Sequence, residues 1–243
     1  MFQWELKLKV EIEMKLSKNL AKIAKKHDKT VPYSLDDAVG LVQGFKFVKF
    51  DESVDLAINL DVDPRHAEEN IRVTTPLPHG TGNEVSILVL ASGPKEKEAA
   101  DAGADYVGNK EYLTKIKKGC TDVDKIVATP DMMGELGKLG KILGPKGLMP
   151  NPKLGSVTND IKKSVLNAKS GQVEIKNDKD GNIALSLGKK SFSDEKLIKN
   201  FNTIFETLEK EKSNMTIKGD LVRSAFLTST MGVSYKIKLP KNI

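Results

Sequence analysis

Two segments of the chain combine residue types that proteins use to bind nucleic acids. In the first, Lys49 and Phe50 stand just ahead of a run in which apolar and polar residues alternate. An exposed ring there can contact a base or a ribose, and packing within a sheet is an equally good explanation of Phe50. In the second, residues 223–232 gather hydroxyl side chains, Arg223 and Gly232. Hydroxyls bind sugars and phosphates and glycine permits close backbone approach, although hydroxyl-rich strand ends are often only sheet edges.

Glycine-rich stretches that suggest nucleotide binding do not match the motifs of nucleotide-binding sites. Residues 188–191 read Gly-Lys-Lys-Ser, like the end of a phosphate-binding loop, but Ile183 stands where the first glycine is required. Residues 134–140 contain repeated glycines inside or after an expected helix, whereas a dinucleotide fingerprint follows a strand and opens a helix. We therefore interpret both stretches as structural.

The histidines and the cysteine are also unsuited to catalysis. His27, His66 and His79 are scattered, without the spacing of a metal site or the neighbours of a catalytic triad. Cys120 is the only cysteine, which excludes an intramolecular disulfide and a site with several cysteine ligands. We predict that the protein is not an enzyme and that it holds no metal and no cofactor.

The composition indicates a globular protein with a weak preference for polyanions. The 243 residues are 39% hydrophobic and 30% charged, which is ordinary for a soluble protein. No membrane span or signal peptide is evident, so we expect a cytoplasmic protein without a membrane partner. Lysine and arginine outnumber aspartate and glutamate by 39 to 33, and the excess lies toward the C-terminal side. This charge balance alone neither favours nor excludes nucleic-acid binding.

The N-terminal part of the chain predicts one short helix and one long strand. Residues 1–13 alternate charged and apolar residues, and we interpret them as a misassigned extension or a frayed β arm; Met14 opens a basic amphipathic helix. Ser34 has the position of a helix cap, and the helix is expected to end at Gly44. Residues 46–60 are predicted to form a strand because their apolar residues alternate with polar ones.

In the rest of the chain the expected order of strands and helices changes twice. From residue 84 short apolar strands alternate with helices, as in a small parallel sheet with helices on its faces. After Gly171, residues 173–176 and 183–187 flank a turn and predict a hairpin, followed by a helix that begins after Ser193 and a strand region over 221–239.

These parts predict an α+β domain with an inserted α/β domain. Neither end of the chain completes a sheet by itself, so we expect residues 14–79 and 173–243 to form one discontinuous antiparallel domain. Residues 80–172 would form the inserted domain. The chain would cross between the two at glycine- and proline-containing segments. The expected hinge residues are Pro78, His79, Gly80, Ser170 and Gly171.

Residues 143–155 form the least ordinary stretch of the sequence. Three prolines and three glycines exclude a regular helix or a central strand, and the leucines and the methionine indicate a loop packed on a surface. The first residues of this loop are Leu143, Gly144, Pro145, Lys146, Gly147, Leu148, Met149 and Pro150.

Taken together, the motifs resemble the ribosomal protein L1 family, the stalk protein of the large ribosomal subunit, in its bacterial or organellar type. The resemblance rests on Lys49–Val54, Leu77–Gly82, Ala102–Asp105, Leu143–Gly155, Asn167–Gln172, Asn177–Lys179 and Ser229–Gly232, which occur in the family's order. Two departures precede the first crossing: Val73 replaces a usual glycine and Pro76 a common aliphatic residue. They leave the angle between the domains open.

The resemblance implies that the split domain binds large-subunit ribosomal RNA and that the insert is a Rossmann-like three-layer domain. It also implies a mobile stalk beside the tRNA exit site that assists release of deacylated tRNA, and in bacteria repression of the protein's own operon through its mRNA. The implied partners are therefore ribosomal RNA, exit-site tRNA and the protein's own mRNA, without an obligate homo-oligomer.

Carried over by position, the family's RNA contacts fall on the two segments described first. They are Lys49, Phe50, Glu52, Ser224, Thr228, Thr230, Met231 and Gly232. We expect the segment of Phe50 and residues 230–232 to lie side by side. Two alternatives are a non-ribosomal RNA-binding member of the same superfamily and a nucleotide-binding enzyme that uses the α/β insert.

Overall fold

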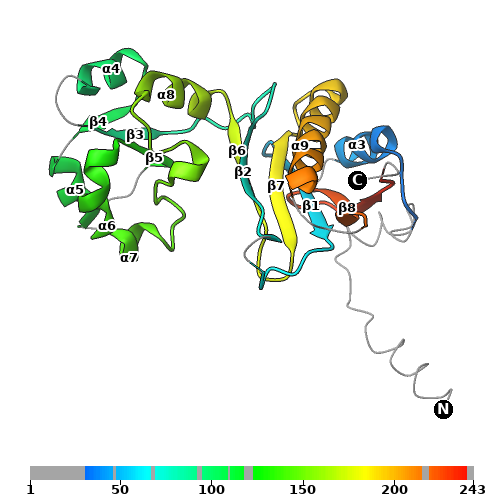
Figure 1. Cartoon of the computed structure of the whole chain (residues 1–243). Helices are drawn as coiled ribbons and strands as arrows, with labels where there is room; N and C mark the ends of the chain where they lie inside the picture. Colours follow the sequence, from blue (N-terminus) through cyan, green and yellow to red (C-terminus); the bar gives the residue numbers. More distant parts are fainter. Residues whose placement is uncertain are drawn as a thin grey trace.

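The computed structural model describes residues 31–45, 48–66, 69–91, 95–108, 110–117, 123–214 and 219–239 of the chain. The expectations for residues 1–13 and for the helix after Met14 lie outside these ranges. The described residues form a mixed structure of helices and three sheets (Figure 1).

The largest sheet combines strands from distant parts of the sequence. Its order is β7 (Asn182–Lys189), β1 (Ser53–Leu60), β8 (Val222–Ser229) and β9 (Tyr235–Ile237), and all neighbours are antiparallel. The central strand β1 therefore takes both partners from the C-terminal third of the chain. The predicted strand over residues 46–60 is too long, because the chain bends at residues 48–50 and joins the sheet only at Ser53.

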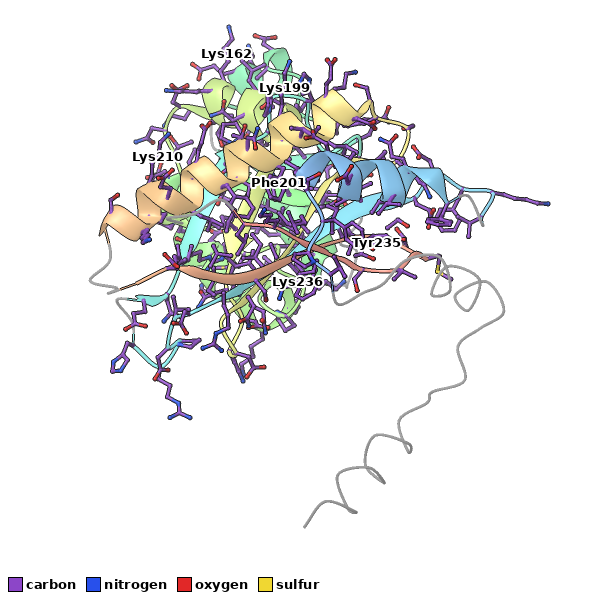
Figure 2. The ribbon with its side chains drawn as sticks, turned by 90° about the vertical axis from the view of Figure 1, so that its right-hand side faces the viewer. Lys162, Lys199, Phe201, Lys210, Tyr235 and Lys236 are labelled. Atoms are coloured by element: carbon purple, nitrogen blue, oxygen red, sulfur yellow. The ribbon has the colours of Figure 1, made fainter. Side chains whose placement is uncertain are left out.

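Two helices cover one face of this sheet (Figure 1). They are α3 (Leu35–Gly44) and α9 (Asp194–Asn214). Every second residue of β1 from Val54 onward is buried against them, as the alternation predicts. Figure 2 shows Phe201 between α9 and the sheet, whereas Lys199 and Lys210 lie on its solvent side.

The cap predicted for α3 is confirmed. The hydroxyl oxygen of Ser34 accepts a hydrogen bond from the amide of Asp37 at 3.2 Å, and the same hydroxyl donates to the Asp37 carboxylate at 2.6 Å. The side chain thus satisfies one of the amide donors that the first helical turn leaves without a backbone partner.

A second sheet is parallel, three-stranded and covered on both faces. Its order is β4 (Tyr106–Gly108), β3 (Ile87–Leu90) and β5 (Lys125–Ala128). Alternate residues of β3 enter two separate apolar clusters. One cluster includes α5 (Lys110–Lys117), α6 (Met133–Gly137) and α7 (Gly140–Leu143), and the other includes α4 (Lys95–Asp101) and α8 (Ile161–Lys169). Two short 3₁₀ helices, η2 (Pro130–Met132) and η3 (Pro152–Leu154), complete this part.

An antiparallel ribbon of two strands lies between these groups of elements (Figure 1). It pairs β2 (Arg72–Pro76) with β6 (Gln172–Lys176). The predicted hairpin of residues 173–176 with 183–187 is therefore wrong: β6 pairs with β2, β7 pairs with β1, and one isolated bridge joins Asn177 to Ile183. Asp178 closes the turn as expected, by accepting from two backbone amides, but the strands then diverge into different sheets.

The two chain crossings touch each other at a pair of glycines. Gly80 and Gly171 have φ values of 64° and 87°, in the left-handed region that favours glycine. A Cβ on Gly171 would lie 2.4 Å from the Cα of Gly80, so no side chain fits there. Asn200 of α9 binds the first crossing through its side chain. Its amide nitrogen donates to the carbonyls of Gly80 and Leu187 at 3.0 and 2.7 Å, and its oxygen accepts from the His79 amide at 3.3 Å.

Candidate nucleic-acid interface

The candidate interface lies where β1 begins and β8 ends. Val54 is paired with Ser229, so the residues just before β1 run beside the turn that follows β8. The amide of Thr230 donates to the carbonyl of Ser53 at 3.1 Å, and the amide of Ser53 donates to the Thr230 hydroxyl at 3.1 Å. The structure thus places the segment of Phe50 beside the 229–232 turn, as expected. We refer to residues 49–53 and 229–232 together as the rim.

Two large apolar side chains of the rim are exposed. Phe50 is 56% exposed and Met231 is 58% exposed. Phe50 precedes β1, so its packing within the sheet, the alternative that the sequence left open, is not observed. Lys49 is exposed beside it. An apolar pair with a neighbouring cation and backbone groups suits a partner that offers both flat apolar faces and negative charge.

Glu52 differs from its neighbours because it is buried inside the rim. Its Oε2 lies 2.7 Å from Nζ of Lys190, and its Oε1 accepts from the amide of Met231 at 3.0 Å and from the hydroxyl of Ser229 at 3.3 Å. Burial alone raises the pKa of Glu52, but the hydrogen bonds from Lys190, Met231 and Ser229 together outweigh it and hold the pKa below its ordinary value. The carboxylate is thus charged at neutral pH and bound by protein groups on both oxygens.

The lysine-rich turn after β7 attaches the rim to the rest of the sheet. The amide and the hydroxyl of Ser191 donate to the carboxylate of Asp51 at 3.1 and 2.7 Å. The amide of Lys190 donates to the carbonyl of Glu52 at 2.8 Å, and Nζ of Lys189 donates to the Ser53 hydroxyl at 3.2 Å. Residues 188–191, which resemble the end of a phosphate-binding loop, hold protein carboxylates here, in agreement with their structural interpretation.

Gly232 has no room for a side chain. A Cβ at this position would lie 2.3 Å from Oγ of Ser229, the hydroxyl that donates to Glu52. The amide of Gly232 also donates to the carbonyl of Ser229 at 3.0 Å, which closes the turn. Any larger residue would displace the Ser229 hydroxyl from its position beside Glu52.

Ser224 and Thr228 occupy a different surface from the rim. They lie on the face of β8 that points away from α3 and α9, opposite Asn59 and Asp55 of β1. Phe226 lies between them on the same face, opposite Lys236 of β9, which Figure 2 labels. The eight predicted contact residues thus fall on the rim and on the adjoining sheet face, which no helix of the described ranges covers and which we call the open face, with Glu52 buried beneath the rim.

The loop that begins at Leu143 lies in another part of the fold. Leu143 and Pro150 are buried, and Gly147, Leu148 and Met149 line a cavity of about 200 Å³. The cavity separates β5 from the β2–β6 ribbon and contains Lys125, whose Nζ donates to the carbonyl of Gln172 at 2.6 Å. Burial lowers the pKa of Lys125, and the nearby carboxylate of Glu174 opposes this shift. The loop is therefore a packed structural element at the edge of the parallel-sheet unit.

Neither a metal centre nor a membrane-spanning helix is found in the described ranges. No group of three His, Cys, Asp or Glu residues among them is placed to hold a metal ion. No helix among them is long and apolar enough to cross a membrane.

Comparison with known proteins identifies the family. Residues 42–233 match the family described as "Ribosomal protein L1p/L10e family". The chain belongs to this family. This L1-family chain is also 59% identical over 195 residues to the protein called "Large ribosomal subunit protein uL1" from Pelagibacter ubique (strain HTCC1062), a match that covers 80% of this chain and 85% of that protein. Both the rim and the open face of β8 lie within the matched residues.

The family assignment confirms several expectations from the sequence. The resemblance to the L1 family is correct, and the L1-family chain is a structural constituent of the ribosome and of the translation machinery, not an enzyme. It also confirms the expected location at the ribosome in the cytoplasm. The roles of the individual residues stay predictions.

Sequence reasoning missed two buried polar residues of this L1-family chain. Lys190 gave no signal beyond a failed phosphate-loop match, because its partner Glu52 lies 138 residues earlier. Asn200 did give a signal in the sequence, because it is a polar residue on the apolar face of the helix, between Leu197 and Ile204. A polar residue at such a position indicates a buried hydrogen-bonding role.

Proposed function

We propose that this L1-family protein binds large-subunit ribosomal RNA through the rim and the open face of β8. The observation that carries the proposal is the presence of two exposed apolar side chains, Phe50 and Met231, on the rim. Hydrogen bonds from the Ser53 amide to Thr230 and from the Met231 amide to Glu52 join the two segments of the rim. RNA offers unstacked bases and ribose to such side chains, and 2′-hydroxyls and phosphates to hydroxyl and backbone groups. This mode of binding needs few arginines, in keeping with the composition.

We further propose the domain division that the sequence suggests. Residues 14–79 and 173–243 would form the RNA-binding domain, and residues 80–172 would form the insert. Separate apolar clusters support this division, since the one around β1 contains residues from both ends of the chain and the two around β3 contain only residues from 85–168. Gly80 and Gly171 would act as the hinge, because their left-handed backbones meet where the chain crosses twice.

In the ribosome the protein would form the mobile stalk beside the tRNA exit site and assist release of deacylated tRNA. The same RNA-binding surface would repress the protein's own operon by binding an mRNA structure similar to the ribosomal site. The resemblance of the motifs to the L1 family supports both roles. No observation favours the non-ribosomal alternative, and the name of the 59% identical relative supports the ribosomal one.

Substitution of the exposed apolar residues tests RNA binding. Phe50→Ala and Met231→Ala should weaken binding to a large-subunit ribosomal RNA transcript, and loss of a base stacked on Phe50 would cost about 1–3 kcal/mol. Leu166→Ala is the matched control, because Leu166 is 53% exposed on α8, a helix that covers the parallel sheet and not the sheet that carries the rim. All three variants should keep the wild-type melting temperature. If the rim variants bind the transcript as tightly as Leu166→Ala does, the interface is misplaced.

Two further measurements separate the cellular roles. Competition between the ribosomal transcript and the protein's own mRNA leader should give displacement of one by the other if a single surface binds both. Ribosomes reconstituted without the protein should release deacylated tRNA more slowly than ribosomes that contain it. Simultaneous binding of both RNAs would contradict autoregulation through this surface, and an unchanged release rate would contradict the role in tRNA release.

A further inference from the structure

The interior of the rim contains an ion pair that solvent barely reaches. The side chain of Lys190 is 8% exposed and that of Glu52 is 4% exposed, with 2.7 Å between Nζ and Oε2. Nζ of Lys190 also donates to the backbone carbonyl of Phe45. Two of the three N–H donors of this ammonium group are thus directed at protein oxygens, although lysine is the most abundant cation of this chain and the usual partner of RNA phosphates.

The second oxygen of the carboxylate acts on the other side of the rim. Oε1 of Glu52 accepts from the amide of Met231 and from the hydroxyl of Ser229, the two groups that set the path of the turn after β8. One carboxylate therefore links the turn after β7, through Lys190, to the turn that presents Met231. The three connected segments are more than 30 residues apart in sequence, so local structure alone does not hold them together.

We propose that Lys190 and Glu52 are positioning residues for RNA recognition: Lys190 neutralises the buried carboxylate, which in turn holds Met231 and Ser229 in the RNA-binding conformation. This inference rests on the proposed function of the rim. It replaces the direct contact that the resemblance implies for Glu52, because both carboxylate oxygens are already bound by protein groups. It also assigns a role to Lys190, which no pattern in the sequence had indicated.

The physical reason is the cost of an unpaired buried charge. Removing the ammonium leaves the Glu52 carboxylate without its counter-ion in a desolvated place, and the carboxylate then moves toward water or takes up a proton. Either change weakens its hold on the Met231 amide. The expected result is a less well ordered rim and weaker RNA binding, without loss of any protein–phosphate contact.

The salt dependence of binding distinguishes positioning from direct contact. Each phosphate contact that is lost makes the slope of log K against log salt shallower by about 0.7 for single-stranded and 0.9 for duplex sites. Lys190→Met should therefore lower the affinity for a large-subunit ribosomal RNA transcript by about 2- to 30-fold and leave the slope unchanged, the range typical of network residues without ligand contact. Lys162→Met, on the exposed side of α8, controls for the loss of one positive charge.

A double variant tests whether the unpaired charge is the cause. Glu52→Gln combined with Lys190→Met leaves no buried charge, while the Gln oxygen can still accept from the Met231 amide. It should bind RNA more tightly than Lys190→Met alone and keep the wild-type slope. If thermal melts show that Lys190→Met does not fold, the double variant is compared with wild type instead. Its affinity for the transcript and its slope of log K against log salt then decide whether Lys190 contacts a phosphate.

The possible results are separable. A shallower slope for Lys190→Met or for the double variant would make Lys190 a phosphate contact and overturn the proposal. An affinity of Lys190→Met equal to that of Lys162→Met, or a double variant that binds no better than the single one, would also overturn it. Failure of the wild-type protein to bind the transcript would instead refute the proposed function of the rim.

Discussion

The amide side chain of Asn200 is expected to be a principal anchor of the first chain crossing. It is fully buried on the inner side of α9 and makes three hydrogen bonds, to Gly80, Leu187 and His79. Asn200→Ala removes all three and leaves buried backbone groups without partners. At about 0.5–1.5 kcal/mol net for each bond, the free energy of unfolding should fall by about 2–4 kcal/mol.

Urea unfolding monitored by circular dichroism measures this loss. Asn202→Ala is the matched control, since Asn202 lies two residues further along the same helix and is exposed; surface substitutions of this kind change stability by about 0.5 kcal/mol or less. Asn200→Asp separates hydrogen bonding from volume, because its charged oxygen would face the two carbonyls that the amide nitrogen now binds. An Asn200→Ala variant within about 1 kcal/mol of wild type would refute the assignment of these bonds as a stabilising anchor.

Two other perturbations have defined outcomes. Gly171→Ala should lower the melting temperature more than Gly147→Ala. Both glycines have positive φ (87° and 70°), but only at Gly171 would an added Cβ collide with a neighbour, the Cα of Gly80. Equal losses in thermal melts would show that backbone strain alone matters. The carboxylate of Glu52, whose pKa is lowered in the folded state, should stabilise the protein at neutral pH and lose this effect as the pH falls from the ordinary carboxyl value of 4.5 through the lower folded pKa. The difference in unfolding free energy between wild type and Glu52→Gln should therefore shrink on acidification in urea titrations, and a difference independent of pH would contradict the buried ion pair.

Local patterns in the sequence predicted most of the elements. The short apolar strands expected after residue 84 are present as β3, β4 and β5, and β5 is an uninterrupted apolar run after one lysine. The first described helix was predictable because Ser34 caps it and Gly44 ends it. Such elements carry their own start and stop signals, so that no distant partner is needed to recognise them.

Pairing between distant segments could not be read from the same patterns. Strand β2 was not predicted, because a proline argues against a strand. Pro76 is nevertheless the last residue of β2 in a two-stranded ribbon, where a missing amide is tolerated. The hairpin was wrongly expected because the turn at Asp178 is real, while the strands on its two sides find better partners far away. For the rim, the residue types suggested a binding surface, but the burial of Glu52 depends on Lys190, which only the fold brings near.

The position of β1 at the centre of its sheet has a consequence for the order of folding. The bonds between Ser53 and Thr230 span 177 residues of sequence, whereas the parallel sheet is built from residues 87–128 alone. Contacts between near residues form faster, because closing a long loop costs more conformational entropy before the contact stabilises it. During synthesis, β1 must therefore wait first for β7 and then for β8, and the parallel sheet can form before either pairing. The rim, made where β1 meets the turn after β8, can therefore form only after residues 229–232 have been synthesised.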